Sequence, residues 1–249
     1  MSKLKAVILA AGKGTRMKSD LPKVLHEIDG KTMVEYVIDA ARQAGAEDIC
    51  LVVGHKADMV KERVGDGVTY VLQEEQLGTG HAVKCAADFI GTDGDTMILC
   101  GDTPIITGRT LQELLAYHRL YELKVTVLST ILEDATGYGR IVRDADGNFL
   151  KIVEQKDATP EEQAIREINS GMYVFRSADL SESLTKITNH NAQKEYYLTD
   201  TIEILRNENE GSNGIVVGAM ATERADETRG VNTVEQLAEA AEILRQREV

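Results

Sequence analysis

Chemically useful side chains are concentrated near the start of the chain, where residues 9–23 read LAAGKGTRMKSDLPK. Two glycines allow backbone amides to approach an anion closely, and Arg16 and Lys23 add two positive charges within reach. Pro22 restricts the chain just before Lys23 and helps to present its ammonium group. The pattern predicts a phosphate-binding loop; the alternative is a plain surface turn with exposed cations.

Two common phosphate-binding motifs do not match this loop. A dinucleotide fingerprint needs a third glycine where Met17 stands, and an acidic residue about 20 residues further on at a strand end, which is missing. A P-loop needs its first glycine at the position of Val7. A dinucleotide-dependent oxidoreductase is therefore a weak alternative.

An aspartate provides the second candidate for chemistry. Asp102, in the segment CGDTP, follows an apolar run and would lie at the carboxyl end of a strand. One or two protein oxygens, completed by substrate phosphates, are the usual ligands of Mg²⁺. Asp102 could instead cap the next turn. The five histidines are scattered and show no metal-ligand spacing.

Composition limits the class of ligand. The 249 residues carry a net charge of −13, which argues against a general nucleic-acid-binding protein. Any nucleotide must therefore be held by a local cluster of cations and by metal. No apolar run approaches the roughly 18 residues that span a bilayer, and no signal-peptide pattern is present. The three cysteines are widely spaced in apolar contexts, which predicts free thiols and a cytoplasmic location.

The first half of the chain alternates between strand-like and helix-like patterns, which predicts an α/β fold with a doubly wound, mostly parallel sheet. Ligands of such sheets bind at the carboxyl ends of the strands, where the glycine loop falls. Strands are predicted at 5–11, 48–54, 68–72 and 95–100, and helices at 33–44, 57–64, 81–90 and 111–121.

The second half predicts an extension of this sheet with a small antiparallel part. Residues 138–155 are typical of a hairpin with Asp146, Gly147 and Asn148 at its tip. Further strands are predicted at 124–132, 167–175 and 215–221, and a helix at 198–207. A terminal helix should bury a stripe made of Val234, Leu237, Ala238, Ala241 and Leu244. We expect one catalytic domain over 1–230, then a helix over 231–249 that docks on this domain or leads elsewhere.

With these elements in place, LAAGKGTRMKSDLPK resembles the signature of sugar-nucleotide pyrophosphorylases. One branch matches further, the uridyltransferase domain of bacterial N-acetylglucosamine-1-phosphate uridyltransferases. The resemblance covers essentially the whole chain and implies a Rossmann-like nucleotidyltransferase fold. In order along the chain, the matching segments are QLGTGHA, CGDTPII, GYGRI, IVEQKDA, INSGMYVF, NAQKEYYLTD and GVNT.

The resemblance assigns roles to particular residues. It implies Mg²⁺ held by Asp102 and Asn232, although Asn232 could equally be a helix cap. Catalysis would fall to Arg16, Lys23 and Asp102, and base recognition to Gln73, Gly78 and Thr79, with Gln76 in support. Sugar recognition would fall to Gly139, Glu154 and Asn169, although Glu154 alone resembles a solvated strand charge. Leu9, Ala10, Ala11, Gly12, Gly14, Thr15 and Gly101 complete the implied substrate-binding set.

The implied reaction joins UTP and N-acetylglucosamine-1-phosphate into UDP-N-acetylglucosamine and pyrophosphate. A phosphomonoester has a second pKa near about 6, so the attacking phosphate is already mostly dianionic and needs no general base. Another sugar phosphate such as glucose-1-phosphate, another base, or a non-catalytic nucleotide-sugar sensor are the alternatives. We expect small-molecule substrates and neither nucleic acid nor membrane as partners. Family members trimerise largely through a following acetyltransferase half, so a homo-oligomer stays open.

Overall fold

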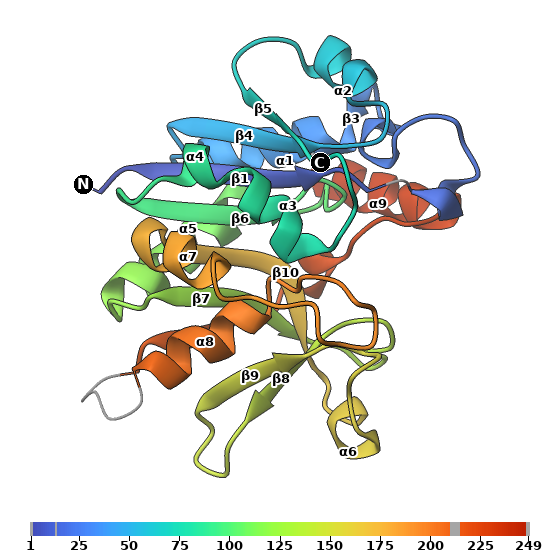
Figure 1. Cartoon of the computed structure of the whole chain (residues 1–249). Helices are drawn as coiled ribbons and strands as arrows, with labels where there is room; N and C mark the ends of the chain where they lie inside the picture. Colours follow the sequence, from blue (N-terminus) through green and yellow to red (C-terminus); the bar gives the residue numbers. More distant parts are fainter. Residues whose placement is uncertain (1, 13, 210–214, 248–249) are drawn as a thin grey trace.

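A central β-sheet organises the molecule (Figure 1). The computed structural model describes residues 2–12, 14–209 and 215–247, and within them nine strands form this sheet. Seven of the described strands follow one another in the order β11-β7-β10-β6-β1-β4-β5. Their bounds are β1 Leu4–Ala10, β4 Asp48–Val53, β5 Thr69–Leu72, β6 Asp95–Cys100, β7 Val125–Ile131, β10 Glu167–Arg176 and β11 Val217–Ala221.

The strand directions confirm the predicted mostly parallel sheet. β1 pairs in parallel with β4 and β6, and β4 with β5, whereas β10 is antiparallel to both β6 and β7. Leu9 pairs with Cys100, and Ala10 pairs with Val53. Because these parallel strands end together, the segments that follow them meet at one edge of the sheet.

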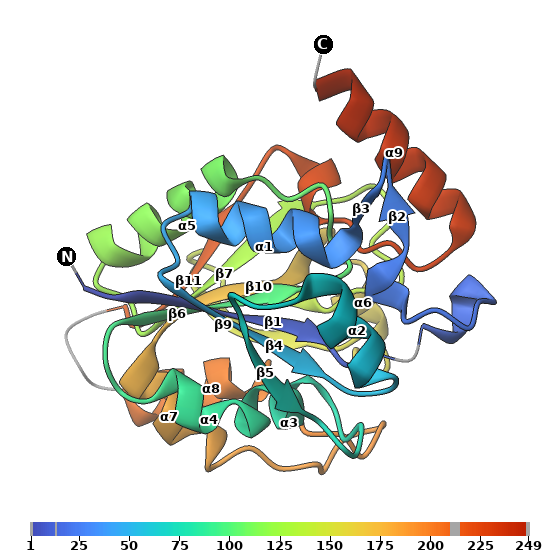
Figure 2. The same cartoon turned by 90° about the horizontal axis from the view of Figure 1, so that it is seen from above.

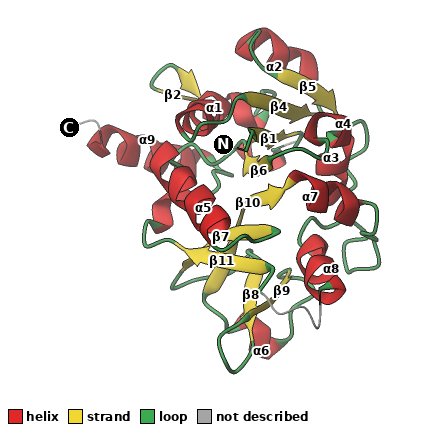
Figure 3. Ribbon diagram, turned by 90° about the vertical axis from the view of Figure 1, so that its left-hand side faces the viewer, coloured by secondary structure: helices red, strands yellow, loops and turns green. Residues whose placement is uncertain are grey.

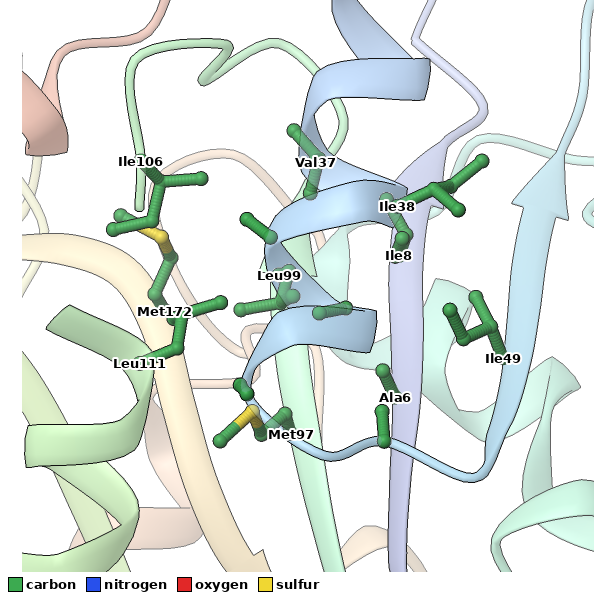
Figure 4. Packing of buried hydrophobic residues seen from close by; sticks show 14 of the residues in the cluster. Ala6, Ile8, Val37, Ile38, Ile49, Met97, Leu99, Ile106, Leu111 and Met172 are labelled. Atoms are coloured by element: carbon green, nitrogen blue, oxygen red, sulfur yellow. The ribbon is translucent and has the colours of Figure 1, made fainter. Parts of the chain in front are cut away.

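Nearly continuous burial along β1 shows that both faces of the sheet are covered. Ala6 and Ile8 belong to one hydrophobic cluster, and Val7 belongs to the cluster on the opposite face. Successive side chains of a strand point to opposite faces, so a fully apolar strand requires two covering layers. In the first layer, Val37 and Ile38 of α1 (Met33–Gln43) pack above the sheet near Ile8 (Figure 4).

Helices form the two covering layers (Figure 2). One layer contains α1, α2 (Ala57–Val64) and α5 (Gly108–Leu120), and the other contains α3 (Thr79–Cys85), α4 (Ala87–Ile90), α7 (Ser177–Leu184) and α8 (Asp200–Glu208). The single helix predicted over 81–90 is wrong, because Ala86 adopts φ −90° and ψ 13° and divides α3 from α4. Within the described part of the chain, every helix is too short or too polar to cross a membrane.

The predicted antiparallel extension is confirmed as a hairpin of β8 (Arg140–Arg143) and β9 (Phe149–Val153). Gly147 lies at its tip with φ +84°, a conformation that favours glycine. β8 also pairs with β10, so the hairpin is joined to the main sheet, with the short helix α6 (Pro160–Gln163) beside it (Figure 3).

The terminal helix α9 (Val234–Arg247) packs on a small hairpin, β2 (Glu27–Ile28) and β3 (Lys31–Thr32), that the sequence patterns did not predict. Leu237, Ala241 and Leu244 belong to the hydrophobic cluster beneath the helix, as predicted. The predicted stripe is nevertheless partly wrong, because Val234 and Ala238 are exposed and Ala240 is buried instead. The cluster that the helix contacts also contains Met33, Ile105 and Val231 from outside the hairpin. Residues 248 and 249 of the predicted helix lie outside the described chain.

Candidate active site

The loop after β1 folds back so that its glycines and cations lie together. Gly14 has φ +61°, and a Cβ built on it would lie 2.5 Å from the Cβ of Lys23. Glycine at this position therefore allows the backbone to pass directly against Lys23, which begins the short 3-10 helix η2 (Lys23–Leu25) after Pro22. Lys13 and the side chain of Thr15 lie outside the part of the chain that the structure describes.

The two predicted cations converge on the two predicted metal ligands. Arg16 Nη2 and Lys23 Nζ donate to Asn232 Oδ1 over 2.7 and 2.6 Å, and Lys23 also forms an ion pair with Asp102. The Lys23 side chain is only 13% exposed, so this contact is partly shielded from water. Residues separated by more than 200 positions in sequence thus form one charged cluster.

Backbone hydrogen bonds hold the two oxygen ligands beside each other. Val231 N donates to Asp102 O over 2.8 Å, and Asn232 Nδ2 donates to Gly230 O over 3.1 Å. A Cβ on Gly230 would lie 3.7 Å from both carboxylate oxygens of Asp102. The side-chain Oδ1 of Asn232 is therefore left to face cations, as its partners Arg16 and Lys23 show.

A cavity of about 310 Å³ opens beside this cluster at the carboxyl ends of β1 and β6. Nine of the residues predicted from sequence line it, namely Leu9, Ala10, Ala11, Gly12, Lys23, Gln73, Gly78, Thr79 and Asp102. Its wall brings together the glycine loop, the end of β5 and the start of α3. The predicted Gly14, Gly101 and Asn232 adjoin lining residues without lining the cavity themselves, and Arg16 contacts Asn232.

Gln73 is a nearly buried residue of the cavity lining. It follows β5, is only 3% exposed, and its backbone N donates to Val53 O over 2.8 Å. Its side-chain Nε2 lies 3.2 Å from Gly78 O. Gly78 has φ +109°, and a Cβ there would lie 2.5 Å from Tyr196 O, so the turn before α3 can only be this compact with glycine.

The three predicted sugar-binding residues form a separate group, with Gly139 just before β8, Glu154 just after β9 and Asn169 on β10. Asn169 N donates to Gly139 O over 2.9 Å, and a Cβ on Gly139 would lie 3.5 Å from Glu154 Oε2. Glu154 Oε1 accepts a hydrogen bond from Thr199 Oγ1 over 3.2 Å. None of the three lines the 310 Å³ cavity within the described chain.

A bulge in β10 connects this group to the cavity. The pairing of β10 with β7 shifts register between Asn169 and Tyr173, and Gly171 in this interval has φ +79°. Cys100, which lines the cavity, lies 3.4 Å through its Sγ from Gly171 O. Cys100 thus stands between the cavity and the Gly139–Glu154–Asn169 group.

The two parts of the site differ in charge. Burial is the main cause that raises the pKa of Glu154, and burial followed by Glu203, Glu154 and Asp157 raises that of Asp200 to about 6. The carboxylates of Asp157 and Glu195 lie near enough to Glu154 to raise its pKa further, whereas Arg16 and Lys23 make the loop side basic. Burial also raises the pKa of the Cys100 thiol to about 12, so this cysteine stays protonated and is no nucleophile at neutral pH.

The donor set at the charged cluster suits a hard divalent cation. Asp102 supplies a carboxylate oxygen and Asn232 an amide oxygen, and a single ammonium group, that of Lys23, already contacts both side chains. Among the residues that the structure describes, no three His, Cys, Asp or Glu side chains gather into a metal site. Two oxygen ligands completed by phosphates are typical of Mg²⁺ rather than of zinc.

Several lining residues carried no role in the sequence predictions: Val24, Ala82, Cys100 and Glu195. Gln76, predicted only as support, lines the cavity too, and its Nε2 donates to Ala11 O over 2.6 Å. Glu195 belongs to the segment NAQKEYYLTD, which was recognised without any single residue being chosen. Its position depends on a long-range contact in which Tyr196 N donates to Leu77 O over 2.8 Å.

Comparison with known proteins shows what this chain resembles. The sequence profile of a family described as "Nucleotidyl transferase" matches residues 5–247. The bifunctional protein GlmU of Caldanaerobacter subterraneus subsp. tengcongensis is 52% identical over 247 residues, which cover 99% of this chain and 53% of that protein. GlmU of Clostridioides difficile is 49% identical over 243 residues, covering 98% and 52% respectively. The chain therefore spans about half the length of the curated relatives it matches.

A solved structure supports the fold. The crystal structure of a UDP-glucose pyrophosphorylase complexed with UDP-glucose aligns with a TM-score of 0.77 over 99% of this chain and 100% of that one. The two sequences are 20% identical, so the likeness is one of architecture.

Proposed function

The chain belongs to the nucleotidyl transferase family, and from this premise we propose that it joins UTP to N-acetylglucosamine-1-phosphate, giving UDP-N-acetylglucosamine and pyrophosphate. The observation that supports this most is the convergence of Arg16, Lys23, Asp102 and Asn232 beside a cavity lined by a glycine loop. The relatives named GlmU match this chain from end to end, which favours their branch of the family.

In the proposed reaction, an oxygen of the sugar phosphate attacks the α-phosphorus of UTP. The new P–O bond forms as the bond to the bridging oxygen breaks, and pyrophosphate leaves with that electron pair. The obstacle is electrostatic, because two anions meet and charge grows on the leaving group. Arg16 and Lys23 would offset this charge, and the amides of the glycine loop would orient the phosphates.

The residues that would hold Mg²⁺ are Asp102 and Asn232, whose oxygens already share a cationic partner in Lys23. When bound there, Mg²⁺ would add positive charge beside the phosphates and favour the leaving group. Lys23 would then be free to turn from Asp102 toward a phosphate oxygen.

The remaining residues would recognise the base and the sugar. Gln73 and the amide of Gly78 would recognise the uracil edge beside the turn before α3. Glu154 and Asn169 would bind sugar hydroxyl and acetamido groups beyond Cys100. The neighbouring structure holds UDP-glucose. A nucleotide sugar is therefore a reasonable occupant of this architecture, and the substrates UTP and a sugar phosphate would place the protein in the cytoplasm.

The test is pyrophosphate release with Mg²⁺ across a panel of four nucleotides and several sugar-1-phosphates. UTP with N-acetylglucosamine-1-phosphate should be fastest. Equal rates with glucose-1-phosphate would overturn the sugar assignment, and UTP binding without turnover on any sugar phosphate would indicate a sensor.

The variant Asp102→Ala separates catalysis from folding. It should lower pyrophosphate release by at least about a hundredfold with an unchanged circular dichroism spectrum. Asp88→Ala, which alters a carboxylate on α4 that is not part of the cavity lining, is the matched control. Ordinary turnover in Asp102→Ala would remove the basis for the metal role.

A further inference from the structure

We propose that His81 is a positioning residue that fixes the side-chain amide of Gln73 and so sets the preference for uracil over cytosine. The inference deepens the proposed function, since it concerns how the base end of the same cavity chooses its nucleotide. His81 lies on α3 behind Gln73 and is not part of the cavity lining.

The environment of Gln73 determines which way its amide points. Nε2 lies 3.2 Å from Gly78 O and 3.1 Å from His81 Nδ1. A backbone carbonyl can only accept, so the group facing Gly78 must be the NH₂ and not the oxygen. The second N–H of the amide then points at His81, and Gln73 Oε1 is left for the cavity.

This arrangement requires one tautomer of His81. If Nδ1 accepts from Gln73, the ring proton must sit on Nε2. Nε2 lies 3.9 Å from Cys85 Sγ, a weak acceptor, and burial raises the pKa of that thiol so that it carries no charge. The N–H at His81 Nε2 therefore faces the neutral sulfur of Cys85, which can accept a weak hydrogen bond.

Backbone hydrogen bonds fix the geometry of the contacts among Gln73, Gly78 and His81. Gly80 N donates to Tyr196 O over 2.8 Å, and the Tyr196 ring lies 6.4 Å from the His81 ring. Gly78 O also accepts from Ala82 N over 3.1 Å, so the carbonyl that faces Gln73 belongs to the first turn of α3. Gln73, Gly78 and His81 therefore keep one mutual orientation.

The orientation of Gln73 discriminates between pyrimidines. Uracil carries an N–H donor at N3, and Gln73 Oε1 can accept a hydrogen bond from it. Cytosine N3 is an acceptor, so its lone pair would face the lone pairs of Gln73 Oε1. A site that hydrogen-bonds one partner rejects an analogue that leaves its buried polar group unpaired. Loss of the His81 contact would let the amide rotate more freely and weaken the choice.

Two uncharged replacements of His81 test the proposal. Asn places an amide near the Nδ1 position and can still accept from Gln73, whereas Gln reaches the Nε2 position only. Calorimetric titration with UTP and with CTP, each with Mg²⁺, should show the affinity ratio falling about tenfold in His81→Gln, the effect of one buried hydrogen bond. The ratio should stay within about threefold in His81→Asn. Lys84→Asn, an exposed change on the same helix, should leave the ratio unchanged.

An unchanged ratio in His81→Gln, or an equal loss in His81→Asn, would overturn the proposal. If either variant fails to fold, a measurement on the unmodified protein still tests the proposal. In protein labelled with ¹⁵N-histidine, Nδ1 of His81 should show the shift of an unprotonated ring nitrogen, and the reverse tautomer contradicts the inference. Because binding is measured without turnover, absence of pyrophosphate release would count against the proposed reaction and not against His81.

Discussion

Lys23 shows how a single side chain can serve two electrostatic partners. Its ammonium contacts Asp102 and Asn232 Oδ1 and so holds both groups close without a metal ion. A lysine that is 13% exposed needs such partners, because an isolated buried charge is costly. The same cation would be available to phosphate once Mg²⁺ neutralised Asp102.

Arg16 should act mainly on the rate. Its guanidinium is exposed and its hydrogen bond to Asn232 Oδ1 is 2.7 Å long, so it is placed at the edge of the charged cluster and not in the cavity wall. Arg16→Ala should lower kcat about a hundredfold with little change in the Kd for UTP, as expected for a charge that stabilises the transition state. Steady-state kinetics with a binding titration would check this, with Lys61→Ala on α2 as control. An effect confined to Kd would contradict the assignment.

Asp200 should make stability depend on pH. Its pKa is raised from 3.8 to about 6, mainly by burial. The unfolded chain therefore loses this proton at lower pH than the folded one, and the contribution to stability falls as pH rises from about 4 through 6. Asp200→Asn should raise the free energy of unfolding at pH 7.5 by about 1 kcal/mol, a figure reduced for its partial exposure and its place at the helix N-terminus. The gain should vanish below pH 4.

Denaturant titrations at several pH values measure this effect. Asp144 provides a control of opposite sign, because its hydrogen bonds with Asn148 lower its pKa. Its stabilising contribution is present above the unfolded pKa and is lost on acidification. Asp144→Asn should therefore bring no gain at pH 7.5, and a pH-independent gain in Asp200→Asn would contradict the prediction.

At the scale of elements, local sequence rules were sufficient for the strands and most of the helices. The continuous apolar run of β1 and the Asp-Gly-Asn turn after β8 carry their structure in adjacent residues. The failures depended on distant contacts. α9 exposes Val234 and buries Ala240 in a cluster with Ile28, Ile105 and Val231, and no periodicity within 231–249 could indicate those partners.

The residues of the candidate site also separate into those that local sequence predicts and those that depend on contacts between distant segments. Gly14, Lys23 and Asp102 could be chosen because a loop after a strand has a recognisable composition. Glu195 could not, since its place in the cavity lining depends on how the segment before α8 packs against the turn before α3. Chain segments far apart in sequence meet there.

A helix cap offers a test at this scale. Thr32 begins α1 with a capping box in which Glu35 N donates to Thr32 Oγ1 and Thr32 N donates to Glu35 Oε2. Thr32→Ala should destabilise the protein by about 1 kcal/mol, or about 2–4 °C in Tm, without changing kcat. Thr159→Ala removes the equivalent cap of α6, a helix with no buried residues, and should cost less. Equal losses would show that the packing of α1 adds nothing to its cap.

Over the whole molecule, a chain of net charge −13 gathers cations at one sheet edge. The parallel strands β1 and β6 end together there, and the segments that follow them supply Lys23 and Asp102. The fold thus sets the positions, and the few residues beyond the strand ends set the chemistry.

The most direct measurement is a crystal structure of this chain with UDP-N-acetylglucosamine. The account predicts the diphosphate against loop 11–23 beside Lys23 and Asp102, uracil at Gln73, and the sugar toward Glu154 and Asn169. A diphosphate bound away from that loop, at any other face of the molecule, would contradict it.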